Sequence, residues 1–325
     1  MKLVIVGLGI QGKKRRVIAG SDVVATVDPI EPTANYKKIV DVPLEDFDAA
    51  CVCTPDGIKI EVLDYLLGCG KHVLVEKPLL ASNNDILLRL GTTAKRTGAV
   101  CYTAYNHRFE PHLVRLKDIL ANKVIGEVYL VQGFYGNGTA RDVRNSSWRD
   151  QGLGVLGDLG SHLLDISLFC FGCPDVLPEV WNCKRFENSA FDHVTFGFSG
   201  KPVFEFQAML LSWRNSFRFD VYGESGSAHV DCLCKWGPST LTIRKRIYPS
   251  GKPDEEIFSL SQRDPTWLAE YRHFQKLCST GGTNLENDLW INETLNHISG
   301  VLASPERKHM NGSESSQSVT SGSLT

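Results

Sequence analysis

Short apolar runs and longer amphipathic stretches alternate along the first 120 residues. The apolar runs predict five strands, at Leu3–Val6, Val23–Val27, Ala49–Cys53, His72–Val75 and Val100–Ala104. The stretches between and after them predict helices near Lys13–Ala19, Ile58–Leu67, Asn83–Thr97 and Pro111–Leu120. Strands that alternate with helices are typical of a parallel sheet built from βαβ units. Because the strands are almost continuously apolar, we expect this sheet to be buried on both faces.

The pattern changes after Leu120. A Gly-rich loop is expected over Gly133–Gly138, followed by a polar stretch and a helix that opens near Gly152 and runs to about Phe171. Strand-like runs then follow at His193–Phe198, Val203–Leu211, Phe217–Tyr222, Ala228–Cys232 and Leu241–Ile247, before two helices at Trp267–Cys278 and Leu289–Leu302. This half of the chain is expected to be an α+β domain with a large, mainly antiparallel sheet.

The domain boundaries follow from these changes of pattern. A chain of 325 residues is long enough for two domains. We expect an α/β domain with a parallel, doubly wound sheet over residues 1–120 and the α+β domain over residues 121–304. Residues 305–325 are rich in Ser and lack apolar periodicity, so a flexible tail is expected there.

Composition excludes several classes of protein. Lysine and arginine number 35 against 37 acidic residues, which leaves a formal charge of −2 and no positive excess for binding nucleic acid. No apolar run approaches the roughly 20 residues of a membrane-spanning helix. The ten cysteines do not form matched metal half-sites, so we expect free thiols, no metal site and a reducing compartment. A cytoplasmic location is the corresponding expectation.

A glycine motif joins the first strand to the first helix. In the segment Gly7-Leu8-Gly9-Ile10-Gln11-Gly12, the first glycine allows a tight turn and the second lets the backbone approach a diphosphate. The third allows close packing of the helix on the strand, and Ile10 and Gln11 lie at the helix N-terminus, where backbone N–H groups bind anions. The motif predicts a Rossmann domain that binds a dinucleotide.

Asp28 indicates which dinucleotide this is. It follows the second strand, about twenty residues beyond the glycines, where a carboxylate binds the ribose 2′-hydroxyl of NAD and repels the 2′-phosphate of NADP. The basic run Lys13–Arg16 leaves NADP as the less favoured alternative, although we interpret that run as a solvated helix face. Thr54 and Pro55 end the third strand at the edge where open α/β sheets hold ligands, and Pro55 is expected to shape the loop.

Two further segments carry side chains suited to acid–base chemistry. Lys77 follows Glu76 at the end of the fourth strand, where an ammonium could stabilise a developing alkoxide or form a salt bridge to Glu76. Asp158, His162 and Asp165 are spaced so that they share one helical face. His162 suits proton transfer near neutrality, and Asp158 could orient it or hold a substrate hydroxyl. The alternatives are a helix cap beside a core histidine, or a metal site completed by a cysteine.

Several segments together resemble the glucose-fructose oxidoreductase, inositol dehydrogenase and MocA family, written Gfo/Idh/MocA, over about residues 1–303. The resemblance rests on the glycine motif, Cys53-Thr54-Pro55, Gly70-Lys-His-Val-Leu-Val-Glu76-Lys77-Pro78, Tyr105-Asn106-His107-Arg108-Phe109, and Trp148-Arg149 leading to Gly157-Asp158-Leu-Gly160-Ser-His162-Leu-Leu-Asp165. The glycine motif is shared by many folds, whereas Glu-Lys-Pro together with the Asp-x-x-x-His helix is specific.

The resemblance implies an NAD(P)-dependent dehydrogenase or reductase acting on a secondary alcohol or ketone of a sugar, polyol or sugar nucleotide. It implies that Lys77 lies near the reacting hydroxyl, that His162 is the general acid/base and that Asp158 is its partner. It also implies cofactor contacts from Glu76, Lys77 and Asn106, and substrate contacts from Lys77, His107, Arg108, Trp148, Arg149, Asp158 and His162. A homodimer or homotetramer through the C-terminal sheet is expected.

Some questions stay open at this stage. Relatives commonly carry a histidine shortly after Thr-Pro, where this chain has Ile58-Lys59, so Lys59 is a candidate cofactor contact. Arg141, Arg144 and Arg149 could hold a substrate phosphate or carboxylate, or could form a solvated loop. An enzyme that keeps NAD bound for transient oxidation, as in glycoside cleavage, and a non-catalytic nucleotide sensor are the alternative functions.

Overall fold

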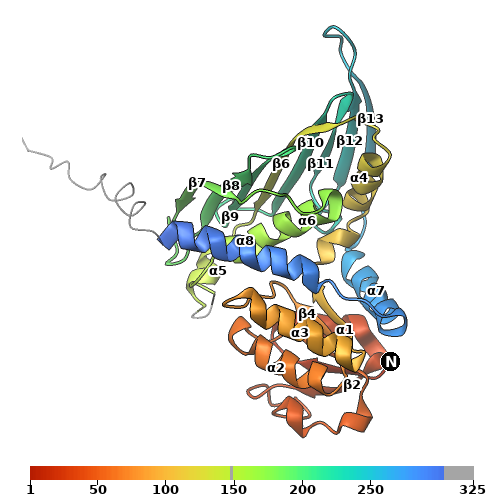
Figure 1. Cartoon of the computed structure of the whole chain (residues 1–325), viewed down its shortest axis with the longest axis vertical. Helices are drawn as coiled ribbons and strands as arrows, with labels where there is room; N and C mark the ends of the chain where they lie inside the picture. The colour runs from red at the N-terminus through yellow and green to blue at the C-terminus, as the bar shows by residue number, and fades with distance from the viewer. Residues whose placement is uncertain (147–148, 304–325) are drawn as a thin grey trace, which may run out of the picture.

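The computed structural model describes residues 1–146 and 149–303 of the chain. Two sheets dominate it, one of five strands and one of eight. Figure 1 shows the five-stranded sheet and its helices at one end of the molecule and the larger sheet at the other, with α8 (Leu285–Ala303) running between them.

The five-stranded sheet is parallel throughout and has the strand order β2-β1-β3-β4-β5. Its strands are β1 (Leu3–Val6), β2 (Val23–Val27), β3 (Ala49–Val52), β4 (His72–Glu76) and β5 (Cys101–Ala104). Helices α2 (Asp56–Gly68) and α3 (Asn84–Thr97) pack together, and α1 (Ile10–Ala19) packs on α7 (Thr266–Thr280). Every residue of β1, β3 and β5 is buried, as the apolar runs predict. The predicted parallel, doubly wound sheet is confirmed.

The eight-stranded sheet has the order β13-β12-β11-β10-β6-β9-β8-β7. Only β6 and β9 pair in parallel, and the other neighbours are antiparallel. Its strands are β6 (Val128–Gly136), β7 (Glu179–Lys184), β8 (His193–Phe198), β9 (Val203–Met209), β10 (Ser216–Gly223), β11 (Gly226–Asp231), β12 (Ser239–Lys245) and β13 (Asp254–Leu260). The predicted α+β domain with a large, mainly antiparallel sheet is confirmed.

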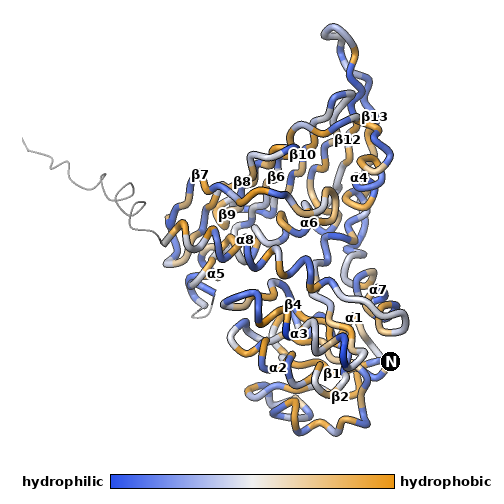
Figure 2. The backbone as a smooth tube through the Cα atoms, in the orientation of Figure 1, coloured by the Kyte–Doolittle hydropathy of each residue, from blue (hydrophilic) through white to orange (hydrophobic). Residues whose placement is uncertain are grey.

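Helices cover one face of this sheet. Helix α4 (Pro111–Ala121) contacts β11 and β12, α6 (Ser161–Phe171) contacts β6, and α8 contacts β7. Buried and partly exposed residues alternate along β9 and β12, as expected for strands with one covered face. Figure 2 shows hydrophobic and hydrophilic positions mixed along these strands, in agreement with that alternation.

The two C-terminal helices connect the sheets. Tyr271 and Phe274 of α7 lie in the same buried cluster as Leu3 and Ile5 of β1, so α7 covers one face of the first sheet. Helix α8 contributes Leu285 to the cluster on the other face of that sheet. Its later residues Ile291, Leu295 and Ile298 belong to the core under the second sheet. The last part of the described chain therefore packs on both sheets.

The expected Gly-rich loop at residues 133–138 is wrong, because β6 continues to Gly136. A Cβ at Gly133 would lie 2.8 Å from the Phe206 ring and 3.1 Å from a Leu163 methyl group. The glycine is needed for close packing of α6 and β9 on the strand. Glycines are used both for close packing and for turns, so the sequence alone does not distinguish the two.

The helix expected from Gly152 to Phe171 also differs. It begins with a π-helical turn at Leu156–Gly160 and continues as α6, while β7, β13 and the short α5 (Ala140–Arg144) were not predicted. The predicted tail at residues 305–325 and Trp148 lie outside the described residues.

All ten cysteines are free thiols. Across residues 1–146 and 149–303, no helix has both the length and the apolar character needed to cross a bilayer.

Candidate active site

The glycine motif forms an open turn between β1 and α1. Gly7 has a φ of 92°, and a Cβ at Gly12 would collide with the carbonyl oxygen of Gly7. No side chain caps the N-terminus of α1, and the Ile10 side chain there is 87% exposed. The first backbone N–H groups of α1 have no intrahelical acceptors. This arrangement fits the diphosphate of a dinucleotide, because those N–H groups and the helix dipole favour an anion.

Asp28 lies beside the same turn. Its Oδ2 accepts a hydrogen bond from the Leu8 backbone N–H at 2.7 Å, and its Oδ1 accepts from the N–H groups of Ile30 and Glu31. Partial burial opposes ionisation, but the three backbone donors hold the pKa of Asp28 below its usual value. The carboxylate is therefore charged and fixed against the glycine turn, where the ribose of a dinucleotide would bind.

The end of β3 places Thr54 near Gly7. The Thr54 hydroxyl is buried and has no hydrogen-bond partner among the residues that the structure describes. Pro55 precedes the first residue of α2, as expected for a loop-shaping proline. Lys59, a candidate cofactor contact, is instead buried, where its Nζ lies 2.6 Å from Asp56 Oδ1 and donates to the carbonyl oxygen of Pro78 at 2.9 Å. Lys59 thus holds the loop that follows Lys77.

The basic run in α1 is exposed as predicted at Lys13, Lys14 and Arg16, and the exception is Arg15. Arg15 is only 2% exposed; its Nε bonds Glu76 at 2.7 Å and its Nη1 bonds Glu270 of α7 at 2.6 Å. The Lys14 ammonium lies 3.6 Å from the centre of the Trp267 ring, and Lys13 pairs with Glu31 at 3.1 Å. The exception has a physical reason, because α7 packs against α1 where Arg15 lies.

Lys77 bridges the two halves of the molecule. Its Nζ donates to the backbone oxygen of Asp158 at 2.6 Å and to Asp158 Oδ1 at 2.9 Å. Arg149 reaches Asp158 Oδ2 at 3.4 Å. Burial alone would raise the pKa of Asp158, but the Lys77 ammonium, with Arg149, holds it below its usual value. The alternative salt bridge from Lys77 to Glu76 does not form, because Glu76 pairs with Arg15.

His162 lies one turn after Asp158, in a buried aromatic group. Its ring stacks on that of His107, with the ring centres 3.9 Å apart and the planes inclined by 30°, and Tyr105 and Tyr135 contact it from other sides. Burial, with the positive charge of Lys77 and Lys235, lowers the pKa of His162 well below its usual value. A neutral imidazole is the form that accepts a proton.

Asp158 bonds Lys77 and Arg149, and the structure shows no hydrogen bond from it to His162. The Nδ1 atom of His162 is buried without a partner among the described residues. Asp158 and His162 therefore lie beside each other without a hydrogen bond between them, and the group that Asp158 orients directly is the Lys77 ammonium.

Asp165, Arg108 and Asn106 bind other protein groups. Arg108 forms a bidentate ion pair with buried Asp165, with N–O distances of 2.6 to 2.9 Å. Asn106 is also buried and donates to the Thr266 hydroxyl at the start of α7 at 2.6 Å. The helical face predicted for acid–base work is thus divided, since Asp165 serves an internal ion pair while Asp158 and His162 lie beside Lys77.

Lys235 is a residue of this group that the sequence analysis does not identify. It lies in the short turn η6 (Cys234–Trp236), and its Nζ is 3.2 Å from His107 Nε2. No motif surrounds it, and 128 residues separate it from His107. Only the folding of the second sheet brings it to this place.

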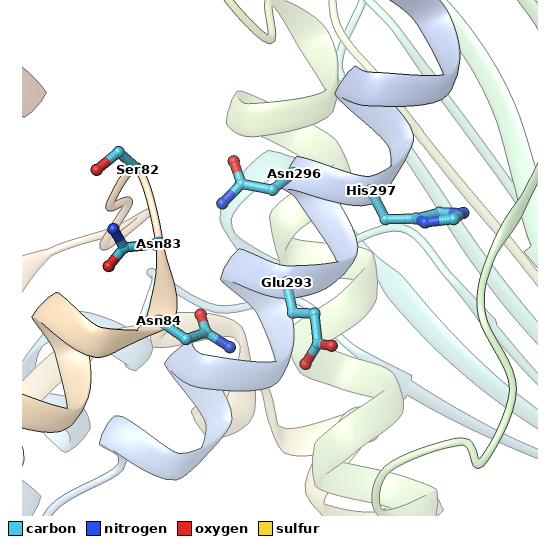
Figure 3. A pocket seen from close by; sticks show the side chains of 6 residues that line it. All are labelled: Ser82, Asn83, Asn84, Glu293, Asn296 and His297. Carbon is cyan, nitrogen blue, oxygen red and sulfur yellow. The ribbon is translucent and has the colours of Figure 1, made fainter.

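A separate shallow hollow lies between the start of α3 and α8. Figure 3 shows its polar lining, formed by Ser82, Asn83, Asn84, Glu293, Asn296 and His297. Beside it, Asn292 accepts a hydrogen bond from the Ala81 N–H at 2.9 Å, and Asn296 donates to the Ala81 carbonyl oxygen at 3.1 Å. These amides hold the segment after Pro78 against α8, so they help to fix the position of Lys77.

Models of two protein domains match the chain. Residues 1–105 match the oxidoreductase family with an NAD-binding Rossmann fold, and residues 113–229 match the GFO/IDH/MocA C-terminal domain. The first match contains the glycine motif, Asp28 and Lys77, and the second contains Asp158 and His162.

Curated relatives are similar at low identity. The uncharacterized oxidoreductase YdgJ of Escherichia coli is 27% identical over 227 residues, which is 67% of this chain and 64% of the relative. The scyllo-inositol 2-dehydrogenase (NADP(+)) IolW of Bacillus subtilis is 25% identical over 267 residues, 79% of this chain and 66% of the relative. The D-glucoside 3-dehydrogenase of Escherichia coli is 31% identical over 138 residues, 40% of this chain and 37% of the relative. The chain thus spans less than two thirds of each of these relatives.

Solved structures share the fold over nearly the whole chain. Levoglucosan dehydrogenase in complex with NADH and levoglucosan superposes with a TM-score of 0.79 at 17% identity, covering 94% of this chain and 98% of that one. An oxidoreductase domain protein from Kribbella flavida also gives a TM-score of 0.79, at 18% identity and the same coverage. These likenesses show the fold, and the two domain matches show that the chain belongs to the Gfo/Idh/MocA family of NAD(P)-dependent oxidoreductases.

Proposed function

We propose that this protein transfers hydride between NAD and a secondary alcohol or ketone of a sugar, polyol or sugar nucleotide. The observation that carries the proposal is the Lys77 ammonium held 2.9 Å from Asp158, with His162 one turn further along the same helix. Lys77 follows β4, and Asp158 and His162 lie on the helical segment that covers the second sheet. They meet beyond the end of β4, at the edge where an open parallel sheet binds its ligands.

Each side chain has a role in this reaction. The nicotinamide, when bound, supplies or accepts the hydride. His162 is neutral because it is buried, so it takes the hydroxyl proton during oxidation and returns it during reduction. An ammonium has three N–H donors, and Asp158 accepts two from Lys77. The third steadies the substrate oxygen as negative charge develops on it.

The chain's own groups favour NAD over NADP. The Asp28 carboxylate is charged and fixed beside the glycine turn, where it would bind a ribose hydroxyl and repel a 2′-phosphate. Arg15 is buried and committed to two glutamates, so it is not free to bind that phosphate. The unpaired Thr54 hydroxyl would complete the cofactor contacts.

A carbohydrate-type substrate agrees with what the relatives' names say they act on, namely an inositol, a glucoside and levoglucosan.

The second sheet also offers a surface for a homodimer or homotetramer. Trp181 of β7 is 48% exposed and Ile257 of β13 is 61% exposed, and each has one neighbour, Val180 or Phe258, that packs in the core under the sheet. Light scattering of the purified protein would give the oligomeric state.

The first test is the nucleotide itself. Absorbance and mass spectra of material released from freshly purified protein, followed by titration of the emptied protein with NAD and NADP, would identify the cofactor. We expect NAD to bind more tightly, and we expect D28S to reduce that preference by about tenfold, as for one lost charge-assisted hydrogen bond. An unchanged preference in D28S would contradict the role of Asp28.

The reaction is tested with the same protein. Inositols, glucosides, levoglucosan and UDP-N-acetylglucosamine are added with NAD, and reduction is followed at 340 nm. Net reduction with any of them supports the proposal. Tightly held NAD that exchanges slowly, without net reduction of added NAD, would instead indicate transient oxidation within another reaction. Failure to bind either nucleotide would exclude the proposed function.

A further inference from the structure

Lys235 has an unusual environment for a lysine. Its Nζ is directed at a neutral imidazole nitrogen, His107 Nε2, at 3.2 Å. Within residues 1–146 and 149–303, no carboxylate lies within ion-pair distance of this ammonium. The ammonium also lies 4.5 Å from the centre of the Trp236 ring, a contact that offsets part of the hydration it loses, so its two neighbours are an aromatic ring and a neutral imidazole.

The hydrogen bond defines the state of His107. An ammonium is a donor only, so Nε2 of His107 accepts the bond and its ring proton lies on Nδ1. Protonation of Nε2 would place two donors face to face. Burial and the charges of Lys235 and Lys77 lower the pKa of His107 well below its usual value. Lys235 therefore fixes both the tautomer and the charge of this ring.

His107 passes this effect to His162. The two rings stack with their centres 3.9 Å apart, and both side chains are buried. Tyr135 lies against both rings. The centre of its ring is 5.4 Å from the centre of the His107 ring and 5.8 Å from that of His162, so neither imidazole can tilt freely. A ring that is fixed in orientation and kept neutral supports its neighbour without competing for the proton.

We propose that Lys235 is a positioning residue that acts through His107 to hold His162 neutral and in the orientation needed to accept the substrate proton. This inference rests on the proposed function of His162. It assigns a role in the acid–base step to a turn of the second sheet that no motif marks.

Other charged groups face this cluster and remain in any variant of Lys235. Burial lowers the pKa of Lys235 to about 8, and Asp264 opposes that effect. Lys235 is therefore mostly charged below neutrality, where a histidine would titrate. The remaining charged groups around Lys235, His107 and His162 come from other segments of the chain, and they are Lys14, Lys77, Glu110, Asp158, Arg149 and Asp264.

The direct test is an NMR titration of the histidine rings in the full chain without substrate. Resonances of His107 and His162 are assigned from their absence in H107N and H162N. In K235M, which keeps the apolar stem, we expect the pKa of His162 to rise by about one unit, since a positive charge within several ångströms is removed. K235R keeps a charged donor and is expected to preserve the wild-type titration. An unchanged pKa in K235M would overturn the proposal.

Kinetics provide a second readout once a substrate is known. The acidic limb of kcat/KM for alcohol oxidation should move to higher pH in K235M and stay in place in K235R. K245M, at the exposed end of β12, serves as the control for removal of a lysine. A loss of affinity confined to anionic substrates, with no shift of the limb, would show that Lys235 binds substrate and would refute the positioning role. If no substrate is turned over, the NMR titration still decides the role of Lys235.

Discussion

Glu76 and Lys77 are consecutive residues at the end of β4, yet they belong to two very different charge clusters. Glu76 bonds Arg15, which also bonds Glu270, and the Arg15 and Glu270 side chains are almost completely buried. Lys77 bonds Asp158, whose side chain is 39% exposed. Glu76 is the last residue of β4 and Lys77 is the first beyond it, and the two side chains meet different neighbours. One therefore enters the interface between α1 and α7, and the other faces the second domain.

The difference separates a structural cluster from a candidate catalytic one. The Arg15 cluster is closed by α7, and two of its polar atoms, Arg15 Nη2 and Glu270 Oε1, have no partner among the described residues. Breaking such a buried pair leaves an uncompensated charge. The Lys77 pair is open to a substrate and has a donor to spare. Removing Lys77 should therefore lower turnover, whereas removing Glu270 should lower the free energy of unfolding.

The largest effect is expected for Lys77. K77M should lower turnover by about 10² or more, in line with the contribution of acid–base and electrostatic groups. Its free energy of unfolding should change by less than about 1 kcal/mol, because the pair with Asp158 is partly exposed. Steady-state kinetics and chemical denaturation measure the two quantities, with K245M as control. Wild-type turnover in K77M would show that the Lys77 cluster is not catalytic, and the proposed difference between the two clusters would be wrong.

Glu270 should show the reverse pattern. E270A is expected to lower the free energy of unfolding by about 3 kcal/mol, because Arg15 stays buried with one partner fewer. The matched control is D64A, which breaks the exposed pair of Asp64 with Arg89 and should cost less than about 1 kcal/mol. Equal losses in the two variants would show that the Arg15 cluster does not depend on burial.

The pH dependence of stability sharpens the same comparison. Burial raises the pKa of Glu270 to about 7 from 4.5, although Arg15 opposes the shift. An acid with a raised pKa in the folded state contributes its full stability below pH 4.5 and loses it as the pH rises through 7. Between pH 5 and 8, the wild type should therefore lose about 2 kcal/mol relative to E270Q. Parallel curves for the two proteins would contradict the raised pKa.

The smallest effect is expected for Arg149. Its contact with Asp158 is long, at 3.4 Å, and Arg144 of the neighbouring α5 already donates to the Glu187 carbonyl oxygen. R149A should raise KM by up to about tenfold for substrates that carry a phosphate or carboxylate, and hardly at all for neutral polyols. An equal change in KM for anionic and neutral substrates would show that Arg149 acts only by binding Asp158.

Much of the architecture was predictable because it is encoded locally. The apolar runs located all five strands of the first sheet to within a residue or two at each end, and the period of polar positions located its helices. The glycine motif was predictable for the same reason, since turn, helix start and close packing involve neighbouring residues. The glycines of β6 misled the prediction because close packing against Phe206 is not a local property.

The sequence by itself determined where the strands and helices lie, and it singled out Lys77, Asp158 and His162. Only the tertiary structure decided which charges are paired. Arg15 and Glu270 are 255 residues apart, and Lys235 is 128 residues from His107. Hydropathy patterns state which face of an element is buried, but they do not state which residue it meets there. A buried charge is stabilised or activated only by that partner, so its role depends on contacts that form when the sheets and the C-terminal helices pack together.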